Sequence, residues 1–90
     1  MPSATVIILN RLGLHARPAA KFVQTAARFE SQISVARNGK NVNGKSIMGM
    51  MMLAAAQGVE IQITTEGSDA EQALSVLTAL VADRFGEESM

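Results

Sequence analysis

Cysteine, tryptophan and tyrosine are absent from the 90 residues of this sequence, and histidine occurs once. The lack of cysteine excludes disulfides, thiolate metal sites and thiol nucleophiles together. A single imidazole cannot supply a histidine-based metal cage, so a structural zinc site is excluded as well. We therefore predict neither a bound metal nor a cofactor.

An excess of charge of one sign and long apolar runs are also lacking. Eight Lys and Arg balance eight Asp and Glu, and three Phe are the only aromatic residues. The chain therefore has neither the positive field nor the stacking surfaces that bind nucleic acid. The longest apolar run, residues 47–56, is about half a membrane span, and the N-terminus has no positively charged signal region. We expect a cytoplasmic protein that binds no nucleic acid and enters no membrane.

The composition favours one domain over residues 1–90. Hydrophobic residues make up 48% of the sequence and charged residues 18%, which is too apolar and too weakly charged for a disordered chain. A chain of this size can bury about 63% of its unfolded surface. That is enough for one core, whereas a second domain would need more chain.

The spacing of apolar residues predicts seven elements. Alternation, clearest at Val59, Ile61 and Ile63, predicts strands, and apolar residues three and four positions apart predict amphipathic helices. Strands are expected at 4–9, 32–37, 40–43 and 59–64, and helices at 16–28, 47–54 and 70–84. Three helices with apolar stripes suit a two-layer α+β fold, in which a largely antiparallel sheet carries the helices on one face.

Three local signals mark the ends of these elements. Asn38-Gly39 is typical of a tight hairpin turn. Segment 68–71 (SDAE) predicts a capping box, in which Ser68 and Glu71 satisfy each other's backbone amides at the start of the last helix. The acidic end of the chain is expected to fray.

The only imidazole, His15, stands directly before the predicted helix 16–28. The unpaired amides and positive dipole of a helix N-terminus favour an anion, and Arg17 adds a permanently charged donor set. The same amides favour a neutral imidazole, whose lone pair can attack phosphorus. A lone histidine is more often structural, and Arg17 alone could be a solvated first-turn residue. The coincidence of imidazole, arginine and helix start favours a phosphoryl site.

Two segments carry a resemblance to a known family. Segment 13–20 (GLHARPAA) looks like the active-site segment of the HPr family, the histidine phosphocarriers of the bacterial phosphoenolpyruvate-dependent phosphotransferase system. Segment 44–49 (GKSIMG) resembles that family's regulatory-serine region, in the same order and at matching spacing. The resemblance covers residues 4–83. Within the family, the run 46–56 and the tail 84–88 look more like the nitrogen-related branch, NPr, than the sugar-transport carrier.

The resemblance implies an open-faced β-sandwich of order β-α-β-β-α-β-α, with four antiparallel strands covered on one face by three helices. It also implies a stoichiometric carrier rather than an enzyme with its own small substrate. Enzyme I would phosphorylate the delta nitrogen of His15, Arg17 would contact the phosphoryl group, and a IIA protein or domain would receive it. We expect a monomer, because a relay needs a free docking surface.

Ser46 has two interpretations. As the N-cap of helix 47–54, its hydroxyl would stabilise that helix by about 1 kcal/mol. In part of the family the matching serine is phosphorylated by a dedicated HPr kinase/phosphorylase, and a dianion at this position would oppose phosphotransfer by repulsion. Both interpretations remain open from the sequence.

Helix 47–54 is unusually rich in methionine. Most of its methionines are expected in the core, because a short amphipathic helix must bury one face. A helix this apolar cannot bury every side, however, and flexible thioethers suit a surface that meets several partners. The expected docking patch for Enzyme I and IIA, as the family pattern suggests, consists of Leu14, Ala20, Ile47, Met48 and Met51.

Two rival functions use the same residues differently. A regulatory adaptor would hold a partner through this patch under the control of Ser46, without relaying phosphate. Loss of function in His15→Ala but not in Ser46→Ala favours the carrier, and the reverse favours the adaptor. A purely structural scaffold would tolerate changes at both His15 and Arg17.

Overall fold

A computed structural model describes residues 1–86 and contains the elements in the predicted order. All three helices end two residues earlier than the sequence predicts. The first strand also ends two residues earlier, and the last strand ends two residues later. The expected fraying of the acidic end falls on residues 87–90, outside the described residues. The elements are β1 (Ser3–Ile7), α1 (Ala16–Ala26), β2 (Gln32–Arg37), β3 (Lys40–Asn43), α2 (Ile47–Met52), β4 (Glu60–Glu66), α3 (Ala70–Ala82) and a short 3-10 helix, η1 (Arg84–Gly86).

The four strands form one antiparallel sheet in the order β1-β4-β2-β3. Register places Ile63 of β4 opposite Val35 of β2, which in turn faces Val42 of β3. Ile61 and Ile63 are buried while Glu60 and Gln62 are exposed, as the alternation predicts. The hairpin between β2 and β3 turns at Asn38-Gly39, both with positive φ, as predicted.

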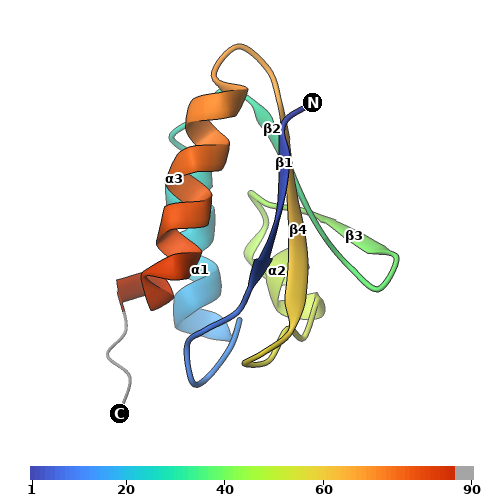
Figure 1. Ribbon diagram of the computed structural model, residues 1–90, viewed down its shortest axis with the longest axis vertical. Helices are drawn as coiled ribbons and strands as arrows, with labels where there is room; N and C mark the ends of the chain where they lie inside the picture. Colours follow the sequence, from blue (N-terminus) through green and yellow to red (C-terminus); the bar gives the residue numbers. More distant parts are fainter. Residues whose placement is uncertain (87–90) are drawn as a thin grey trace.

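All three helices lie on one side of the sheet, and the other side is open (Figure 1). Helix α1 buries Ala19, Phe22 and Ala26, and α3 buries Leu77 and Val81 against the inner faces of the strands. Each fully buried large side chain contributes about 1.5–3 kcal/mol to folding. The predicted open-faced sandwich is confirmed.

The start of α3 differs from the sequence prediction. Asp69, not Ser68, is the N-cap residue, and no side chain caps the helix, so the predicted capping box is wrong. The Asp69 carboxylate instead accepts hydrogen bonds from the backbone N–H groups of Glu30 and Ser31, at 3.0 Å each, and from the Ser31 hydroxyl. Asp69 thus ties the start of α3 to the residues directly before β2, and this long-range partner replaces the local cap.

Candidate functional site

His15 is the N-cap residue of α1. Its backbone is extended, at φ −95° and ψ −162°, and its carbonyl accepts the first helical hydrogen bond from Ala19 N at 2.9 Å. No side chain caps this helix and no acidic residue lies in its first turn. Because Pro18 has no N–H, the amides of Ala16 and Arg17 are the donors at the open end of α1.

The two ring nitrogens of His15 differ in their surroundings. His15 as a residue is half-buried, and its Nε2 is buried and has no hydrogen-bond partner among residues 1–86. Nδ1 is therefore the ring nitrogen left to meet an electrophile from solution.

The loop before His15 is held rigidly. Asn10 Nδ2 donates to the Gly13 carbonyl at 2.8 Å, inside the protein. Leu14 N donates to the Ala55 carbonyl at 2.9 Å, which joins the loop to the segment after α2. Gly13 has φ +69°, and a Cβ there would lie 2.5 Å from the Ala55 oxygen. Only glycine fits, so the turn that places His15 depends on this close approach.

The segment after α2 is held in turn by two cations of the β2–β3 hairpin. Arg37 Nη1 donates to the carbonyls of Leu53 at 2.8 Å and Ala54 at 3.1 Å. Lys40 Nζ donates to the Met52 carbonyl at 3.4 Å. These bonds satisfy carbonyls that a helix C-terminus leaves unpaired, where positive charge is also favourable. Sequence reasoning missed both residues, because nothing local to the hairpin indicates which helix end it meets.

A shallow hollow adjoins the imidazole. Its lining is apolar apart from His15, and it joins the loop before α1 to the helix that carries the methionines. The lining residues are Leu12, Leu14, His15, Met51, Ala54, Ala55 and Ala56.

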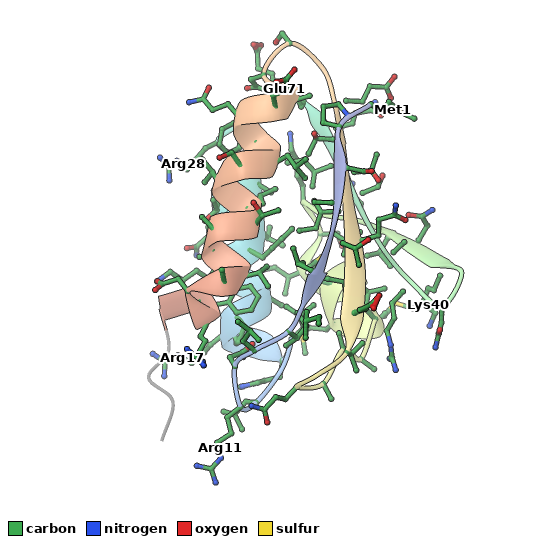
Figure 2. All side chains as sticks on the ribbon, viewed as in Figure 1. Met1, Arg11, Arg17, Arg28, Lys40 and Glu71 are labelled. Atoms are coloured by element: carbon green, nitrogen blue, oxygen red, sulfur yellow. The ribbon has the colours of Figure 1, made fainter. Side chains whose placement is uncertain are left out.

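Arg17 is exposed on the first turn of α1, and its side chain has no hydrogen-bond or ion-pair partner within residues 1–86. Figure 2 places Arg17 and Arg11 at one end of the molecule, with Met1 and Glu71 at the other. The guanidinium of Arg17 is thus available to an anion near the start of α1.

Ser46 is the N-cap of α2, as predicted. Its Oγ accepts a hydrogen bond from Gly49 N at 3.0 Å, and its carbonyl accepts one from Met50 N at 3.0 Å. The side chain is half-buried. The capping role of Ser46 is therefore present in the fold.

The expected docking residues do not all reach the surface. Ile47, Met48 and Met51 are exposed, and Ala20 is half-buried. Leu14 is only 3% exposed and belongs to the core, so its side chain offers almost no surface to a partner, whereas Leu12 is 64% exposed. A leucine just before a helix can turn inward or outward, and only packing decides which. We use the name apolar patch for the exposed residues Leu12, Ile47, Met48, Met51 and Met52.

The prediction that most methionines of α2 are in the core is wrong. Met50 is buried, whereas the other three in this helix are exposed. Helix α2 has six residues and packs against α1 and β3. A helix this short therefore needs only one buried methionine to fill its contact with α1 and β3.

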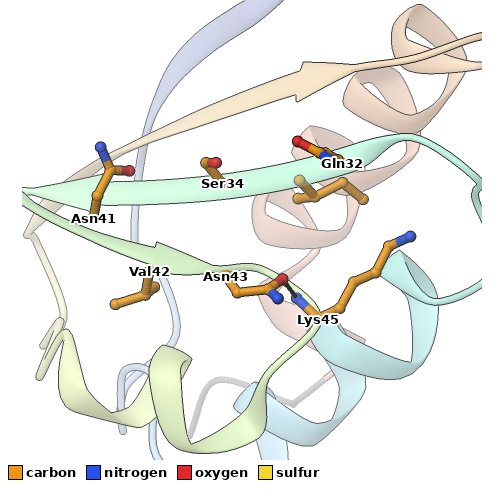
Figure 3. Close-up of a pocket in the computed structure, with 7 residues that line it drawn as sticks. Gln32, Ser34, Asn41, Val42, Asn43 and Lys45 are labelled. Carbon is orange, nitrogen blue, oxygen red and sulfur yellow. Dashed lines mark hydrogen bonds between the residues drawn. The ribbon is translucent and has the colours of Figure 1, made fainter.

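A second hollow lies along the hairpin of β2 and β3 (Figure 3), with Ser34, Asn41 and Asn43 among its lining residues. Lys45 is its only charged side chain, and Lys45 Nζ donates to the Phe29 carbonyl at 2.7 Å. No imidazole, thiol or carboxylate lines this hollow, so it holds no nucleophile of the kind found at His15.

Two other kinds of feature are absent from residues 1–86. No group of three or more His, Cys, Asp or Glu could hold a metal ion within that range. None of the helices there is long and apolar enough to cross a membrane.

The fold and the site together define a small two-layer protein with one imidazole at an open helix N-terminus, beside a free arginine and an apolar patch. A family model described as "PTS HPr component phosphorylation site" matches residues 2–83. The phosphocarrier protein HPr of Neisseria meningitidis serogroup A is 51% identical over 87 residues, which cover 97% of this chain and 98% of that protein. The chain therefore belongs to the HPr family of phosphocarrier proteins of the phosphotransferase system.

Solved structures show the same fold. The crystal structure of HPr-C-His from Thermoanaerobacter tengcongensis has a TM-score of 0.94 to this chain at 51% identity, covering 98% of this chain and 99% of that one. A structure described as an HPr dimer from the same organism has a TM-score of 0.78 at 50% identity, covering 97% and 100%.

Proposed function

We propose that this chain accepts a phosphoryl group from phospho-Enzyme I on Nδ1 of His15 and passes it to a IIA protein or domain. The observation that carries the proposal is the burial of Nε2, which leaves Nδ1 as the reactive nitrogen at the N-terminus of α1. Membership of a phosphocarrier family supports it, and does not favour the adaptor alternative.

The transfer needs only a nucleophile and charge compensation. The Nδ1 lone pair of a neutral His15 forms a bond to phosphorus as the P–N bond of the donor phosphohistidine breaks, and the electron pair of that bond returns to the donor nitrogen. The acceptor imidazole of IIA then attacks the same phosphorus, and His15 is regenerated. The chain is consumed and restored once per transfer, so it acts as a carrier and needs no metal of its own.

Two groups compensate the phosphoryl charge. The backbone amides of Ala16 and Arg17 stand at the positive end of α1, where an anion is favoured. The Arg17 guanidinium, which has no other partner among residues 1–86, provides forked donors for phosphoryl oxygens. Positioning and electrostatics of this kind supply most of the catalysis in phosphoryl transfer.

We propose that Enzyme I and IIA dock on the apolar patch around the His15 hollow, together with Ala20. The patch is exposed, contiguous with the hollow through Leu12 and Met51, and apolar, which are properties of partner-binding surfaces. A monomer keeps this patch open to Enzyme I and IIA alternately. Ser46, next to the patch, is the proposed target of a kinase, and a phosphate there would repel a phosphorylated partner.

The test is incubation with phosphoenolpyruvate and Enzyme I, taken in parallel from the sugar and the nitrogen branch, followed by phosphorus NMR. We expect an acid-labile phosphohistidine signal that is lost in His15→Ala. The Enzyme I that phosphorylates the chain faster identifies the branch to which the chain belongs. Arg17→Ala should slow transfer strongly, whereas Arg28→Ala, which removes another exposed arginine near the far end of α1, should not. No signal with either donor would overturn the proposal.

A further inference from the structure

The six-residue helix α2 presents three thioethers to solvent. The exposed fractions are 76% for Met48, 43% for Met51 and 60% for Met52, against 0% for Met50. Met51 also lines the hollow that contains His15. The exposed methionine side chains of α2 therefore lie beside the surface from which the phosphoryl group is handed on.

Together with Met1, which is 82% exposed, these methionines are the oxidisable side chains that residues 1–86 expose to a two-electron oxidant. The sequence has no cysteine, tryptophan or tyrosine to compete for the oxidant. Oxidation of methionine adds one polar oxygen to an otherwise apolar side chain, and reductases specific for each sulfoxide epimer reverse it. The reaction requires access to sulfur. Side-chain exposure favours that access at three positions of α2, and complete burial denies it at Met50.

We propose that Met48, Met51 and Met52 form a reversible oxidation site that switches off docking of the carrier to its partners. This inference rests on the proposed function. The oxidant is a peroxide: the sulfur lone pair attacks one peroxide oxygen, the O–O bond breaks, sulfur loses two electrons, and water leaves. Reduction returns the thioether by transferring two electrons from a pair of thiols, which become a disulfide, and releases the oxygen as water.

Oxidation is expected to weaken docking because docking buries these methionine side chains. Burying a thioether in an interface has a small desolvation cost. Burying a sulfoxide costs more, because its oxygen loses hydrogen bonds to water unless the partner supplies a donor. One unsatisfied oxygen is enough to weaken association about tenfold. Because Enzyme I and IIA meet the same patch in turn, oxidation slows both half-reactions.

The experiment begins with limited hydrogen peroxide treatment of the full chain and peptide mapping of added oxygen. Two methionines serve as internal references. Met50 is buried in the same helix, and Met1 is exposed at the opposite end of the molecule from Arg17 (Figure 2). We expect oxidation of the three α2 residues and of Met1, with Met50 unmodified. The denaturant midpoint of the treated protein shows whether the fold is retained.

The functional measurement is the ratio of treated to untreated transfer rate, for Enzyme I and IIA separately. We expect a decrease of about tenfold in each, with recovery after both sulfoxide reductases and dithiothreitol. The variant Met48→Leu/Met51→Leu/Met52→Leu keeps an apolar patch without oxidisable sulfur there. Compared with its own untreated rate, this variant should lose nothing to peroxide.

Several outcomes would overturn the site. One is a protein carrying sulfoxide at all three positions that transfers phosphate at the untreated rate. Another is a triple-leucine variant that loses activity as the parent does, because the sensitive group would then lie elsewhere. Failure of the three sulfurs to oxidise while Met1 does would show that they are shielded. If the untreated chain already fails to form a His15-dependent phosphohistidine, the proposed function itself fails, which the first measurement distinguishes.

Discussion

Arg37 Nη1 lies 2.8 Å from the carbonyl oxygen of Leu53, sixteen residues further along the chain. The same nitrogen also reaches the Ala54 carbonyl, and the next residue, Ala55, receives the hydrogen bond from Leu14 N. The Arg37 side chain of the β2–β3 hairpin therefore holds the segment after α2, to which the loop before His15 is hydrogen-bonded. We therefore expect Arg37 to be a positioning residue, which acts on the imidazole only through that segment.

Replacing Arg37 should weaken both the fold and the transfer. Arg37→Ala removes two charge-assisted bonds from a partly buried side chain, and we expect a loss of about 1–2 kcal/mol in the free energy of unfolding. The transfer rate of the folded fraction should fall about threefold to tenfold, since small displacements of a nucleophile are costly. Urea unfolding and phosphotransfer kinetics measure the two effects. Arg37→Lys should restore part of each, and a variant with unchanged transfer would remove Arg37 from the positioning role.

Alanine substitutions at Gly13 and Gly58 distinguish the cost of backbone strain from the cost of a steric clash. Both have positive φ, +69° and +87°, but a Cβ would strike the Ala55 oxygen at Gly13 and nothing within 4 Å at Gly58. Gly58→Ala should cost about 1 kcal/mol of stability with transfer preserved. Gly13→Ala should cost more and reduce transfer by about a hundredfold, because the loop before His15 must move. Equal effects in the two variants would contradict this account of the loop.

Ser46 can be tested for charge and capping independently. Asn, Asp and Ser are all good N-cap residues, whereas Ala is poor. Ser46→Ala should therefore lose about 1 kcal/mol of stability with its transfer rate little changed. Ser46→Asp and Ser46→Asn should keep the cap, and only the charged variant should slow phosphorylation by Enzyme I. If Ser46→Asp accepts phosphate as fast as Ser46→Asn, charge at this position does not regulate transfer.

Asp69 makes stability depend on acid pH. Hydrogen bonds from the Ser31 hydroxyl and from the Glu30 backbone N–H lower the pKa of the Asp69 carboxyl below its ordinary value of 3.8. A carboxyl with a lowered folded-state pKa contributes stability that is fully present above 3.8 and is lost as the pH falls through the folded value. In that window the unfolded chain binds more protons, so stability rises with pH.

The measurement is the free energy of unfolding of the parent and Asp69→Asn as a function of pH. At neutral pH the variant should be the less stable protein. The difference between the two should shrink as the pH falls below 3.8. A difference that stays constant across this range would show that the Asp69 charge is not what holds the loop to Ser31.

Much of this protein could be predicted from local sequence. The alternation at Ile61 and Ile63 gave a strand with one buried face, and the hydroxyl of Ser46 gave the start of α2. These strand and helix predictions succeeded because each depends on residues within one or two turns of one another, where backbone periodicity and capping chemistry act. His15 before a helix start, followed by Arg17, indicated a phosphoryl site, and that role stays a prediction.

Tertiary structure decided the features that depend on residues far apart in the chain. Asp69 binds Ser31, 38 residues away, in place of the local cap that its own segment predicted. Leu14 turns into the core while Leu12 stays outside, and Met50 alone among the methionines of α2 is buried. The burial of His15 Nε2 is of the same kind. Composition and spacing fix which side chains are available, but only packing between distant segments determines which of them, and which of their atoms, remain in contact with solvent.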